Sequence, residues 1–299
     1  MSSAYEFTKK KLGAGSYGEV TVAVRKSDGK HVAVKRSRCD VGIPYTTIRE
    51  IACLRAVTHR NVVPLIDIFV SRTHACLVFP AFKEDLYAHI DRKGPLSLNA
   101  IRQRGEELLG ALDHLHRRKI IHRDLKPSNI LVDASGSFHV ADFGLAKWAE
   151  SFTCHTTQVV TLQYRAPEIL AGSDLYTESS DIWSMGCILA EVATAEILFF
   201  GRSEAEQLIL LLRYIGQDPA EKMSEDALRG NLSRLLESHV EEDDGSSLIR
   251  FLPRRFGQGD HLFPRFLRLL EECLTACPDS RCTAGQALHH DFFSAMDID

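Results

Sequence analysis

The sequence predicts an α+β fold made of two unequal lobes. Roughly the first 82 of its 299 residues contain short stretches in which apolar and polar residues alternate, as in strands, whereas the remainder shows the i, i+3, i+4 apolar spacing of helices. Hydrophobic residues make up 44% of the chain, which is enough for a sizeable core. We therefore expect a β-rich N-lobe at residues 1–82, a larger, mainly helical C-lobe at residues 83–299, and a cleft between them.

Charge and composition exclude several classes of partner. The chain carries 36 Lys and Arg against 40 Asp and Glu, a formal net charge of −4, so we expect neither nucleic acid nor a membrane surface as a partner. The N-terminus lacks a signal-peptide run, and no stretch reaches the ~18 apolar residues of a membrane helix. The eight cysteines are scattered, which predicts reduced thiols in an intracellular protein of the nucleus, the cytoplasm or both.

In the N-lobe, the alternation of apolar residues predicts a β-hairpin. Its strands are expected at Glu19–Arg25 and His31–Lys35, with a turn rich in Gly, Asp and Ser between them. Apolar residues at helical spacing predict a helix over Pro44–Val57, and Ala75–Phe79 is expected to form a short apolar strand.

In the C-lobe, helical periodicity starts at about residue 97. Leu108–Leu115 carries one apolar stripe, whereas Asp181–Val192 is apolar nearly all round and is expected to be a buried helix. Two capping boxes, in which each side chain bonds the other residue's backbone amide, predict the starts of later helices. They are Ser203 with Glu206, and Thr283 with Gln286.

A glycine-rich loop lies near the N-terminus, with the sequence Gly13-Ala14-Gly15-Ser16-Tyr17-Gly18. In a dinucleotide-binding unit such glycines open a helix, but here they run directly into the strand Glu19–Arg25. We therefore expect the loop to cap a hairpin and to lie over phosphates, where glycines let the backbone approach a ligand closely. An ordinary glycine-rich turn is the alternative.

Further motifs follow this loop in a fixed order. Lys35 ends the strand Val32-Ala33-Val34-Lys35, and Glu50 lies in the next predicted helix. Then come His122-Arg123-Asp124-Leu125-Lys126-Pro127-Ser128-Asn129, Asp142-Phe143-Gly144 and Ala166-Pro167-Glu168. By these motifs the chain resembles the eukaryotic protein kinases from the glycine loop to Arg281, which implies the two-lobed protein kinase fold over residues 5–293.

The resemblance implies a catalytic role for each motif residue. Lys35 is expected to hold the α- and β-phosphates of ATP, with Glu50 holding Lys35 in place. Asp124 is expected to accept the proton of the substrate hydroxyl, and Lys126 to steady the γ-phosphate. The Mg²⁺ ligands implied are Asn129 and Asp142, whose oxygens suit a hard cation.

These residue types fit phosphoryl transfer. The reaction needs a clamp on the phosphates, metal ions that neutralise developing charge, and a carboxylate beside the attacking oxygen. A catalytically silent scaffold is the alternative, although that class usually lacks one of Lys35, Asp124 or Asp142, and all three are present.

The resemblance also places the remaining nucleotide pocket. An apolar sandwich around adenine is implied for Leu12, Val20, Ala33 and Leu131, with Phe79 at the gatekeeper position and Asp85 near the ribose. Pro80 is unusual in the hinge that binds adenine. Because the family uses the carbonyl of this residue and the amide of Phe82, a proline that lacks only its own N–H leaves adenine recognition intact. The phosphate side is implied for Gly13, Gly15, Ser16, Tyr17 and Gly18.

Three segments are similar to the cyclin-dependent kinases. They are Gly42–Ile51, which contains the sequence PYTTIRE, Val159–Glu168 and Ser180–Ile188. The resemblance implies a cyclin-type regulatory subunit, without which Glu50 is expected to swing away from Lys35. The alternatives are a related kinase that needs no cyclin, in which the helix is merely amphipathic, and a mitogen-activated kinase. The last of these carries Thr-x-Tyr in a segment where this chain has none.

The same resemblance implies regulation by phosphorylation. An upstream activating kinase is expected to modify Thr156, or less favourably Thr157, whose phosphate would face Arg49, Arg123 and Lys147. Inhibitory phosphorylation is expected at Tyr17, and also at Ser16. Protein substrates are expected to be modified on Ser or Thr, before Pro. Gln163 and Lys147 depart from the family pattern of Trp and Arg.

Overall fold

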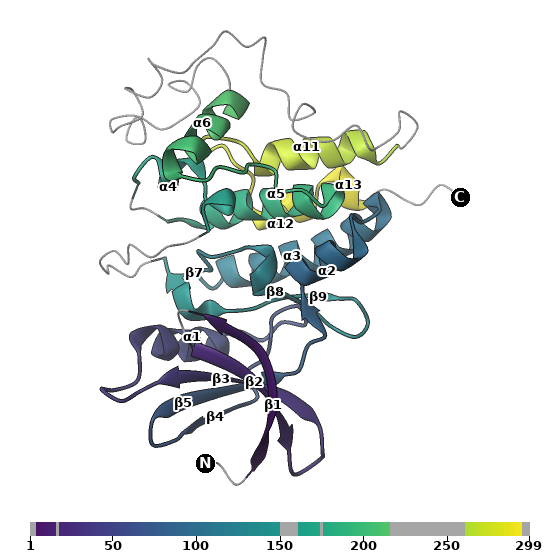
Figure 1. Cartoon of the computed structure of the whole chain (residues 1–299). Coiled ribbons are helices and arrows are strands. Elements are labelled where there is room, and N and C mark those ends of the chain that lie inside the picture. Colours follow the sequence, from purple (N-terminus) through teal and green to yellow (C-terminus); the bar gives the residue numbers. More distant parts are fainter. Residues whose placement is uncertain (1–3, 16–17, 150–160, 174–175, 216–260, 295–299) are drawn as a thin grey trace.

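The computed structural model describes residues 4–15, 18–149, 161–173, 176–215 and 261–294. It has the two lobes that the sequence predicts (Figure 1). The N-lobe is one antiparallel sheet with the strand order β1-β2-β3-β5-β4, accompanied by the helix α1 (Tyr45–Ala56). The strands are β1 (Tyr5–Gly15), β2 (Gly18–Arg25), β3 (His31–Arg38), β4 (Asp67–Val70) and β5 (His74–Pro80).

The predicted N-lobe hairpin is confirmed. Strands β2 and β3 pair in antiparallel register from Glu19–Arg36 to Val24–His31, so β3 extends three residues beyond its predicted end at Lys35. One face of the sheet buries a small apolar cluster made of Tyr5, Ala23, Val32, Val34, Cys76 and Val78. Consecutive residues are buried from Val32 to Lys35 in β3 and from Ala75 to Val78 in β5, so these central strands are covered on both faces.

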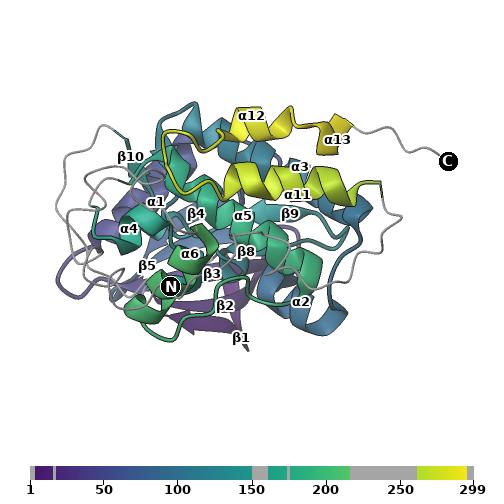
Figure 2. The ribbon, with the colours of Figure 1, turned by 90° about the horizontal axis from the view of Figure 1, so that it is seen from above.

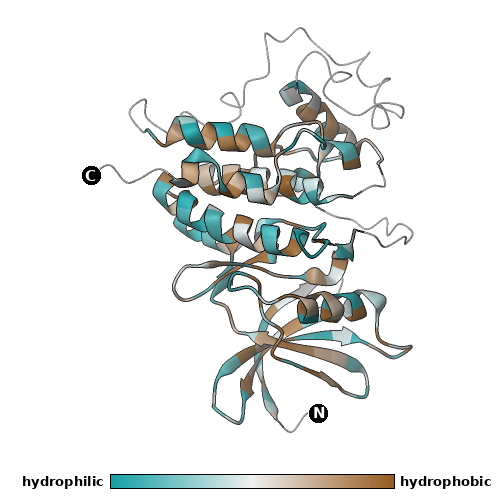
Figure 3. Cartoon of the chain, turned by 180° about the vertical axis from the view of Figure 1, so that it is seen from behind, coloured by the Kyte–Doolittle hydropathy of each residue, from teal (hydrophilic) through white to brown (hydrophobic). Residues whose placement is uncertain are grey.

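The C-lobe is mainly helical and is arranged around α5 (Glu178–Thr194), whose side chains are buried from Ser180 to Ala193. Seen from behind, the helices of the C-lobe carry hydrophobic and hydrophilic residues side by side (Figure 3). Helices α3 and α11 pack against α5, and seen from above, α11 and α12 cover the layer of α3 and α5 (Figure 2). The other described helices are α2 (Leu86–Lys93), α3 (Leu98–His116), α4 (Pro167–Leu170), α6 (Glu204–Ile215), α11 (Phe263–Cys273), α12 (Ala284–Leu288) and α13 (Asp291–Ser294).

Short strands lie at the boundary between the lobes. They form a three-stranded sheet of β6 (Glu84–Asp85), β8 (Ile130–Val132) and β9 (Phe138–Val140), and a pair of β7 (Ile120–Ile121) with β10 (Lys147–Trp148). The catalytic-loop motif therefore lies between β7 and β8, and Asp142 follows β9 by two residues. Paired strands on both sides fix the ends of each loop.

The two predicted capping boxes have different outcomes. The box at Thr283 and Gln286 is confirmed, with Gln286 N–H donating to Thr283 Oγ1 at 3.2 Å and Thr283 N–H donating to Gln286 Oε1 at 2.8 Å. At α6, Glu206 N–H donates to Ser203 Oγ, but the Glu206 carboxylate accepts from the backbone N–H of Arg202, one residue earlier than predicted.

Within the described residues, no helix combines the length and the apolar character needed to cross a membrane.

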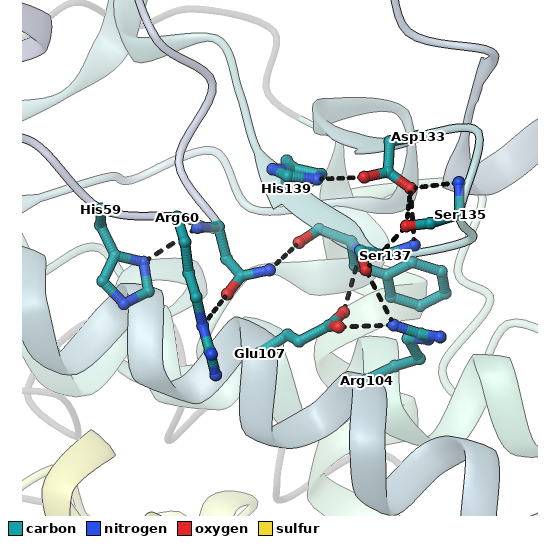
Figure 4. A network of polar contacts seen from close by, with 10 residues as sticks. His59, Arg60, Arg104, Glu107, Asp133, Ser135, Ser137 and His139 are labelled. Carbon is teal, nitrogen blue, oxygen red and sulfur yellow. Dashed lines mark hydrogen bonds and ion pairs between the residues drawn. The ribbon is translucent and has the colours of Figure 1, made fainter.

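The loop after α1 is fastened to the C-lobe by Asn61. Its side-chain amide donates to Phe138 O at 2.9 Å, and its backbone carbonyl accepts from Val140 N–H at 2.9 Å. His59 Nδ1 accepts the backbone N–H of Asn61 at 3.1 Å. The network continues through α3 and the turn between β8 and β9, at Arg104, Glu107, Asp133, Ser135, Ser137 and His139 (Figure 4). Buried, paired polar groups thus hold the two lobes in a defined register.

Candidate active site

Three charged side chains from distant parts of the chain meet at the cleft. Lys35 Nζ lies 2.9 and 2.8 Å from the two carboxylate oxygens of Glu50, and 2.9 Å from Asp142 Oδ1. Lys35 comes from β3, Glu50 from α1, and Asp142 follows β9. All three were predicted as site residues, and the structure brings them together.

Burial and charge act in opposite directions on these groups. Burial alone would lower the pKa of Lys35, but the adjacent Glu50 and Asp142 carboxylates raise this pKa above its usual value. Burial also opposes the ionised form of Asp142, yet Lys35 holds its pKa below the usual range. The lysine is therefore an ammonium and Asp142 a carboxylate at neutral pH, the forms that bind phosphates and a cation.

The catalytic-loop motif forms a second cluster on the C-lobe side of the cleft. Lys126 Nζ lies 3.1 and 2.9 Å from the carboxylate oxygens of Asp124, and Asn129 Nδ2 donates to Asp124 Oδ2 at 2.9 Å and to its backbone carbonyl at 2.8 Å. Asp124 is almost fully buried. This carboxylate is consequently held in one orientation by two neighbours that were predicted with it.

Asp181, at the start of α5, positions this loop. The fully buried carboxylate accepts the backbone N–H groups of His122 and Arg123 at 2.8 and 2.9 Å, and His116 Nε2 lies 3.0 Å away. Burial disfavours its charge, but the hydrogen bond with His116 helps to hold the pKa of Asp181 below its usual value. Arg123 has φ +70°, an uncommon conformation for this residue type that these bonds maintain.

The Asp-Phe-Gly motif is fixed by its central residue. Phe143 is fully buried in the main core, its ring lies 5.1 Å from that of His122, and the turn it begins packs against α1. Asp142 has φ +60° and accepts the N–H of Gly144 at 3.3 Å. The side chain of Asp142 is thereby directed toward Lys35 while Phe143 fills the core.

The third glycine of the glycine loop is needed by the sheet itself. At Gly18, φ is +134°, and an added Cβ would lie 2.2 Å from the carbonyl oxygen of Arg36 in β3. At Gly13 an added Cβ would contact nothing within 4 Å. The hairpin prediction is confirmed, since Gly15 and Gly18 pair in register. The steric demand at Gly18 comes from the neighbouring strand, whereas the predicted reason was the approach of a ligand.

The residues predicted to contact adenine come from both lobes. Leu12, Val20 and Ala33 come from β1, β2 and β3, and Leu131 comes from β8 in the C-lobe. Phe79 pairs in register with Ala33 and is the second-last residue of β5, so it lies beside Ala33 in the N-lobe sheet. Leu12 is 45% exposed, so its apolar side chain is accessible to a ligand.

The hinge residues have further contacts. Pro80 ends β5 opposite Val32, and the ring of Phe82 meets that of His139 edge-on at 4.9 Å. Asp85, predicted near the ribose, uses Oδ1 to accept the N–H of Ala88 at 2.8 Å and so caps α2. It pairs in register with Leu131 between β6 and β8, so it lies next to one of the residues predicted to contact adenine.

A buried ion pair anchors the end of the stretch from Asp142 to Glu168, which corresponds to the activation segment of the kinases that the chain resembles and is called so below. Arg281 donates from Nη1 and Nη2 to the two carboxylate oxygens of Glu168 at 2.9 and 3.0 Å, and its guanidinium lies 5.2 Å above the ring of Trp183. Tyr164 OH donates to Glu191 in α5 at 2.6 Å, and Ser184 Oγ donates to Tyr164 O at 2.7 Å. Residues 161–170 are consequently fastened to the C-lobe core.

The predicted phosphate-binding cations lie at the junction of α1 and the catalytic loop. The guanidinium of Arg49 lies 4.7 Å above the ring of Tyr45, and that of Arg123 lies 4.5 Å above the ring of Tyr176. Burial lowers the pKa of Arg123, and the positive charge of Arg49 lowers it further. Lys147 lies on β10 opposite Ile121, the residue before the catalytic-loop motif. Among the described residues, neither arginine has an ion pair with a carboxylate.

The predicted regulatory residues Ser16, Tyr17 and Thr156, together with the alternative Thr157, lie outside the described residues. Three residues that organise the site were not predicted as site residues: Asp181, Asn61 and Arg281. Asp181 lies in the segment Ser180–Ile188, which was interpreted only as a helix and a family resemblance. Its acidic type at the start of an apolar helix was the available sequence signal.

Comparison with known proteins agrees with this geometry. Residues 6–293 match the family described as "Protein kinase domain". The chain is 36% identical over 302 residues to "Cell division control protein 2 homolog 1" of Trypanosoma brucei brucei, which covers 98% of this chain and 99% of that protein. It is also 36% identical over 290 residues to "Cell division control protein 2 homolog 3" of the same organism, covering 95% and 90% respectively.

The chain therefore belongs to the protein kinase family, and its fold is the two-lobed kinase fold. Its relatives are Cdc2-related kinases, which place it with the cyclin-dependent kinases within that family.

Proposed function

We propose that this protein kinase transfers the γ-phosphate of ATP to Ser or Thr hydroxyls of protein substrates. The observation that carries the proposal is the assembled pair of clusters. Lys35 of the N-lobe is bonded to Glu50 and, across the lobes, to Asp142, and in the C-lobe Asp124 is bonded to Lys126 and Asn129. A silent scaffold has no need to maintain both.

The residues divide the work of the reaction. The Lys35 ammonium binds the α- and β-phosphates, and Glu50 keeps it from turning away. The substrate oxygen attacks the γ-phosphorus as the bond to the β,γ-bridging oxygen breaks and ADP leaves. Asp124 accepts the hydroxyl proton, and Lys126 offsets the charge on the transferring group. Preorganised charges need little rearrangement as the bond order changes.

Mg²⁺ fits the donors present at this site. The Asp142 carboxylate is about one third exposed and faces the cleft beside Lys35, and Asn129 offers an amide oxygen, both hard ligands of the type that Mg²⁺ prefers. When bound, the ion neutralises charge on the phosphates. The protein's own contribution is to fix both side chains, Asp142 through its bond to Lys35 and Asn129 through its two bonds to Asp124.

Substitution of the two clusters tests the proposal. We expect Asp124→Asn and Lys35→Met each to lower phosphate transfer to a Ser/Thr-Pro peptide library by at least a hundredfold, or ~2.7 kcal/mol. Lys30→Met, at an exposed lysine in the turn before β3, is the matched control and should retain activity. Wild-type protein that binds ATP with its partner but transfers no phosphate would favour the scaffold.

We further propose that activity depends on a cyclin-type regulatory subunit that covers α1. Val41, Ile43, Tyr45 and Ile48 are large apolar residues of α1 and the segment before it, and all are exposed, by 102, 40, 61 and 49%. Adjacent exposed apolar residues of this kind are typical of a protein interface. The chain alone already has Glu50 bonded to Lys35, contrary to the expectation that Glu50 swings out, so the partner's proposed role is to stabilise this arrangement.

Phosphorylation of Thr156 by an upstream kinase is proposed as the activating step. Arg123 is a half-buried cation whose pKa is lowered by the nearby charge of Arg49, an arrangement that favours binding of an anion. We expect Thr156→Ala to lose most activity after treatment with an activating kinase, with Thr157→Ala as the matched control. Loss confined to Thr157→Ala would move the assignment by one residue.

Two further proposals concern specificity and inhibition. Proline after the target residue is expected to be preferred, so replacing this proline of a substrate peptide by alanine should lower kcat/KM by about tenfold, or ~1.4 kcal/mol.

Phosphorylation at Tyr17, and also at Ser16, is proposed to inhibit the kinase by placing negative charge near the ATP phosphates. Site-specific phosphorylation that leaves the rate unchanged would contradict the second proposal.

A further inference from the structure

Two cysteines far from the active site lie in contact between α11 and α12. Cys273 is the last residue of α11 and Cys282 precedes α12 by two residues, and their sulfur atoms are 3.8 Å apart and hydrogen-bonded. Both are free thiols. Cys273 is fully buried, whereas Cys282 is partly exposed, so a small oxidant has access to only one of the pair.

We propose that Cys273 and Cys282 are a reversible modification site, oxidised by hydrogen peroxide to a disulfide that weakens the anchor of the activation segment. In the first step the Cys282 thiolate attacks a peroxide oxygen, giving a sulfenic acid and hydroxide, which becomes water on protonation. The Cys273 sulfur then attacks the Cys282 sulfur, its proton leaves, and the sulfenic oxygen departs as a second water. Two thiols lose two electrons in total, and one peroxide is reduced to two waters.

The local chemistry assigns the order of these steps. The hydrogen bond from Cys273 lowers the pKa of Cys282, which favours the thiolate on the exposed partner. The same hydrogen bond, together with burial, raises the pKa of Cys273. Since the thiolate is the nucleophile, Cys282 reacts first with the oxidant and Cys273 resolves the product.

Formation of the disulfide must move Cys282 more than Cys273. A disulfide holds its sulfurs ~2.05 Å apart, well short of the present 3.8 Å. Cys273 is held against α5, because a Cβ added at Gly186 would lie 3.0 Å from the Cβ of Cys273 and 2.8 Å from the side chain of Leu274. Cys282 is partly exposed and packs at the edge of the core, where its backbone N–H donates to Glu272 O at the long distance of 3.4 Å. We therefore expect the approach of the two sulfurs to displace the chain at Cys282 rather than at Cys273.

Arg281 directly precedes Cys282 and would move with it. This arginine is 4% exposed and binds both carboxylate oxygens of Glu168, and it also donates to the carbonyls of Thr275 and Ser179. A bidentate pair depends on correct alignment of both partners. Displacement of Arg281 therefore loosens Glu168 and the segment that ends there, and we expect phosphate transfer to fall.

Peptide mapping of the whole protein tests the modification directly. Purified wild-type protein is treated with hydrogen peroxide, blocked with iodoacetamide and digested without reductant. We expect a peptide pair joined by Cys273 and Cys282, which separates on addition of dithiothreitol. Alkylation of both cysteines after unfolding, or a disulfide from Cys282 to another cysteine such as Cys277, overturns the proposal.

Variants test the consequence. Cys277→Ser, at a partly exposed cysteine in the same segment, is the matched control for Cys282→Ser. Peroxide should lower phosphate transfer at least fivefold in wild type and in Cys277→Ser, with recovery in dithiothreitol, and should spare Cys282→Ser and a second variant, Cys273→Ala. Equal loss in all four proteins, or no loss once the disulfide has formed, overturns the regulatory effect.

Only the activity measurement rests on the proposed kinase function. Trp183 fluorescence is an independent readout, since the guanidinium of Arg281 lies over its ring and the chain has only one other tryptophan, Trp148. We expect peroxide to change the emission reversibly in wild type but not in Cys282→Ser. A disulfide and a fluorescence change in a protein without kinase activity would contradict the proposed function and leave the modification intact.

Discussion

The two lobes differ in charge and in how they bury apolar side chains. Residues 1–82 contain thirteen Lys and Arg against six Asp and Glu, whereas residues 83–299 contain twenty-three against thirty-four. Of the nine large hydrophobic residues exposed in the described parts of the chain, seven lie in the N-lobe. The C-lobe thus covers its own core, while the positive N-lobe leaves apolar surface for another molecule.

Helix α1 belongs to the N-lobe in sequence, but its buried side chains pack into the core of the C-lobe. The sheet has its own small cluster, but the buried residues Cys53, Leu54, Val57 and Val62, from α1 and the loop after it, are part of the large core that contains Phe143 and α5. Packing against the C-lobe explains why Glu50 remains bonded to Lys35 in the chain alone. The position of α1 therefore depends on the C-lobe core, and its outer face remains open to a partner.

The largest effect is expected on breaking the C-lobe anchor. Glu168→Gln leaves the buried Arg281 charge without its carboxylate, and removal of one partner of a buried pair costs ~3–5 kcal/mol of folding free energy. For a domain of this size that corresponds to a fall in Tm of roughly 6 to 20 °C. Thermal unfolding followed by calorimetry measures it.

The matched control is an exposed pair on the same lobe. Arg268→Gln removes the bond to Asp291, where both side chains are about half exposed, so its cost should be within ~1 kcal/mol. Equal shifts in Tm for the two variants would show that the Glu168–Arg281 pair contributes no more than a surface pair, and that the C-lobe core is stable without it.

The sequence predicted the fold and the catalytic residues because these follow from local pattern and short motifs. Lys35, Asp124 and Asp142 each lie in such a motif, and the structure brings Lys35 beside Asp142 and the catalytic-loop motif beside the Asp-Phe-Gly motif. Asp181 was missed because its partners are the backbone amides of His122 and Arg123, about sixty residues earlier, and backbone partners leave no pattern in a sequence. Tertiary packing, which a single sequence does not display, also determined the position of Glu50.

A smaller effect is expected when the open surface of the N-lobe is made polar. Ile48→Glu places a charge in the proposed partner interface, and we expect at least tenfold weaker partner binding, or ~1.4 kcal/mol, without a change in Tm. Since the N-lobe is positive, we also expect a partner with an acidic rim and an association rate that falls with salt. Co-purification with the tagged chain measures the retained partner.

Val70→Glu provides the matched control for this surface. Val70 is also exposed, by 60%, but it lies on β4 and not on α1. Equal retention of the partner by both variants would contradict the interface at α1, and equal loss would indicate a more extensive N-lobe interface than the four apolar residues define.

The smallest effect concerns pH and the junction of the lobes. The rings of His59, in the loop after α1, and His114, on α3, lie 5.1 Å apart. Burial lowers the pKa of both from the usual 6.5, and the nearby cations Arg60 and Arg118 contribute, with Asp113 opposing the shift at His114. His59 Nδ1 accepts from Asn61 N–H, and His114 Nδ1 accepts from Arg118 at 3.2 Å, so both rings are neutral in the folded protein.

A histidine whose pKa is lower in the folded state than in the unfolded state destabilises the fold as pH falls. Stability is full above pH 6.5 and decreases through more acidic pH, because the unfolded chain then binds more protons. Among the described residues His114 Nε2 has no hydrogen-bond partner, so His114→Leu should cost little at pH 7.5 and should reduce the fall in Tm between pH 7 and pH 5. His261→Leu, at an exposed histidine, should leave that fall unchanged. If both variants follow the wild-type curve, the junction between the lobes is not the acid-sensitive part of the molecule.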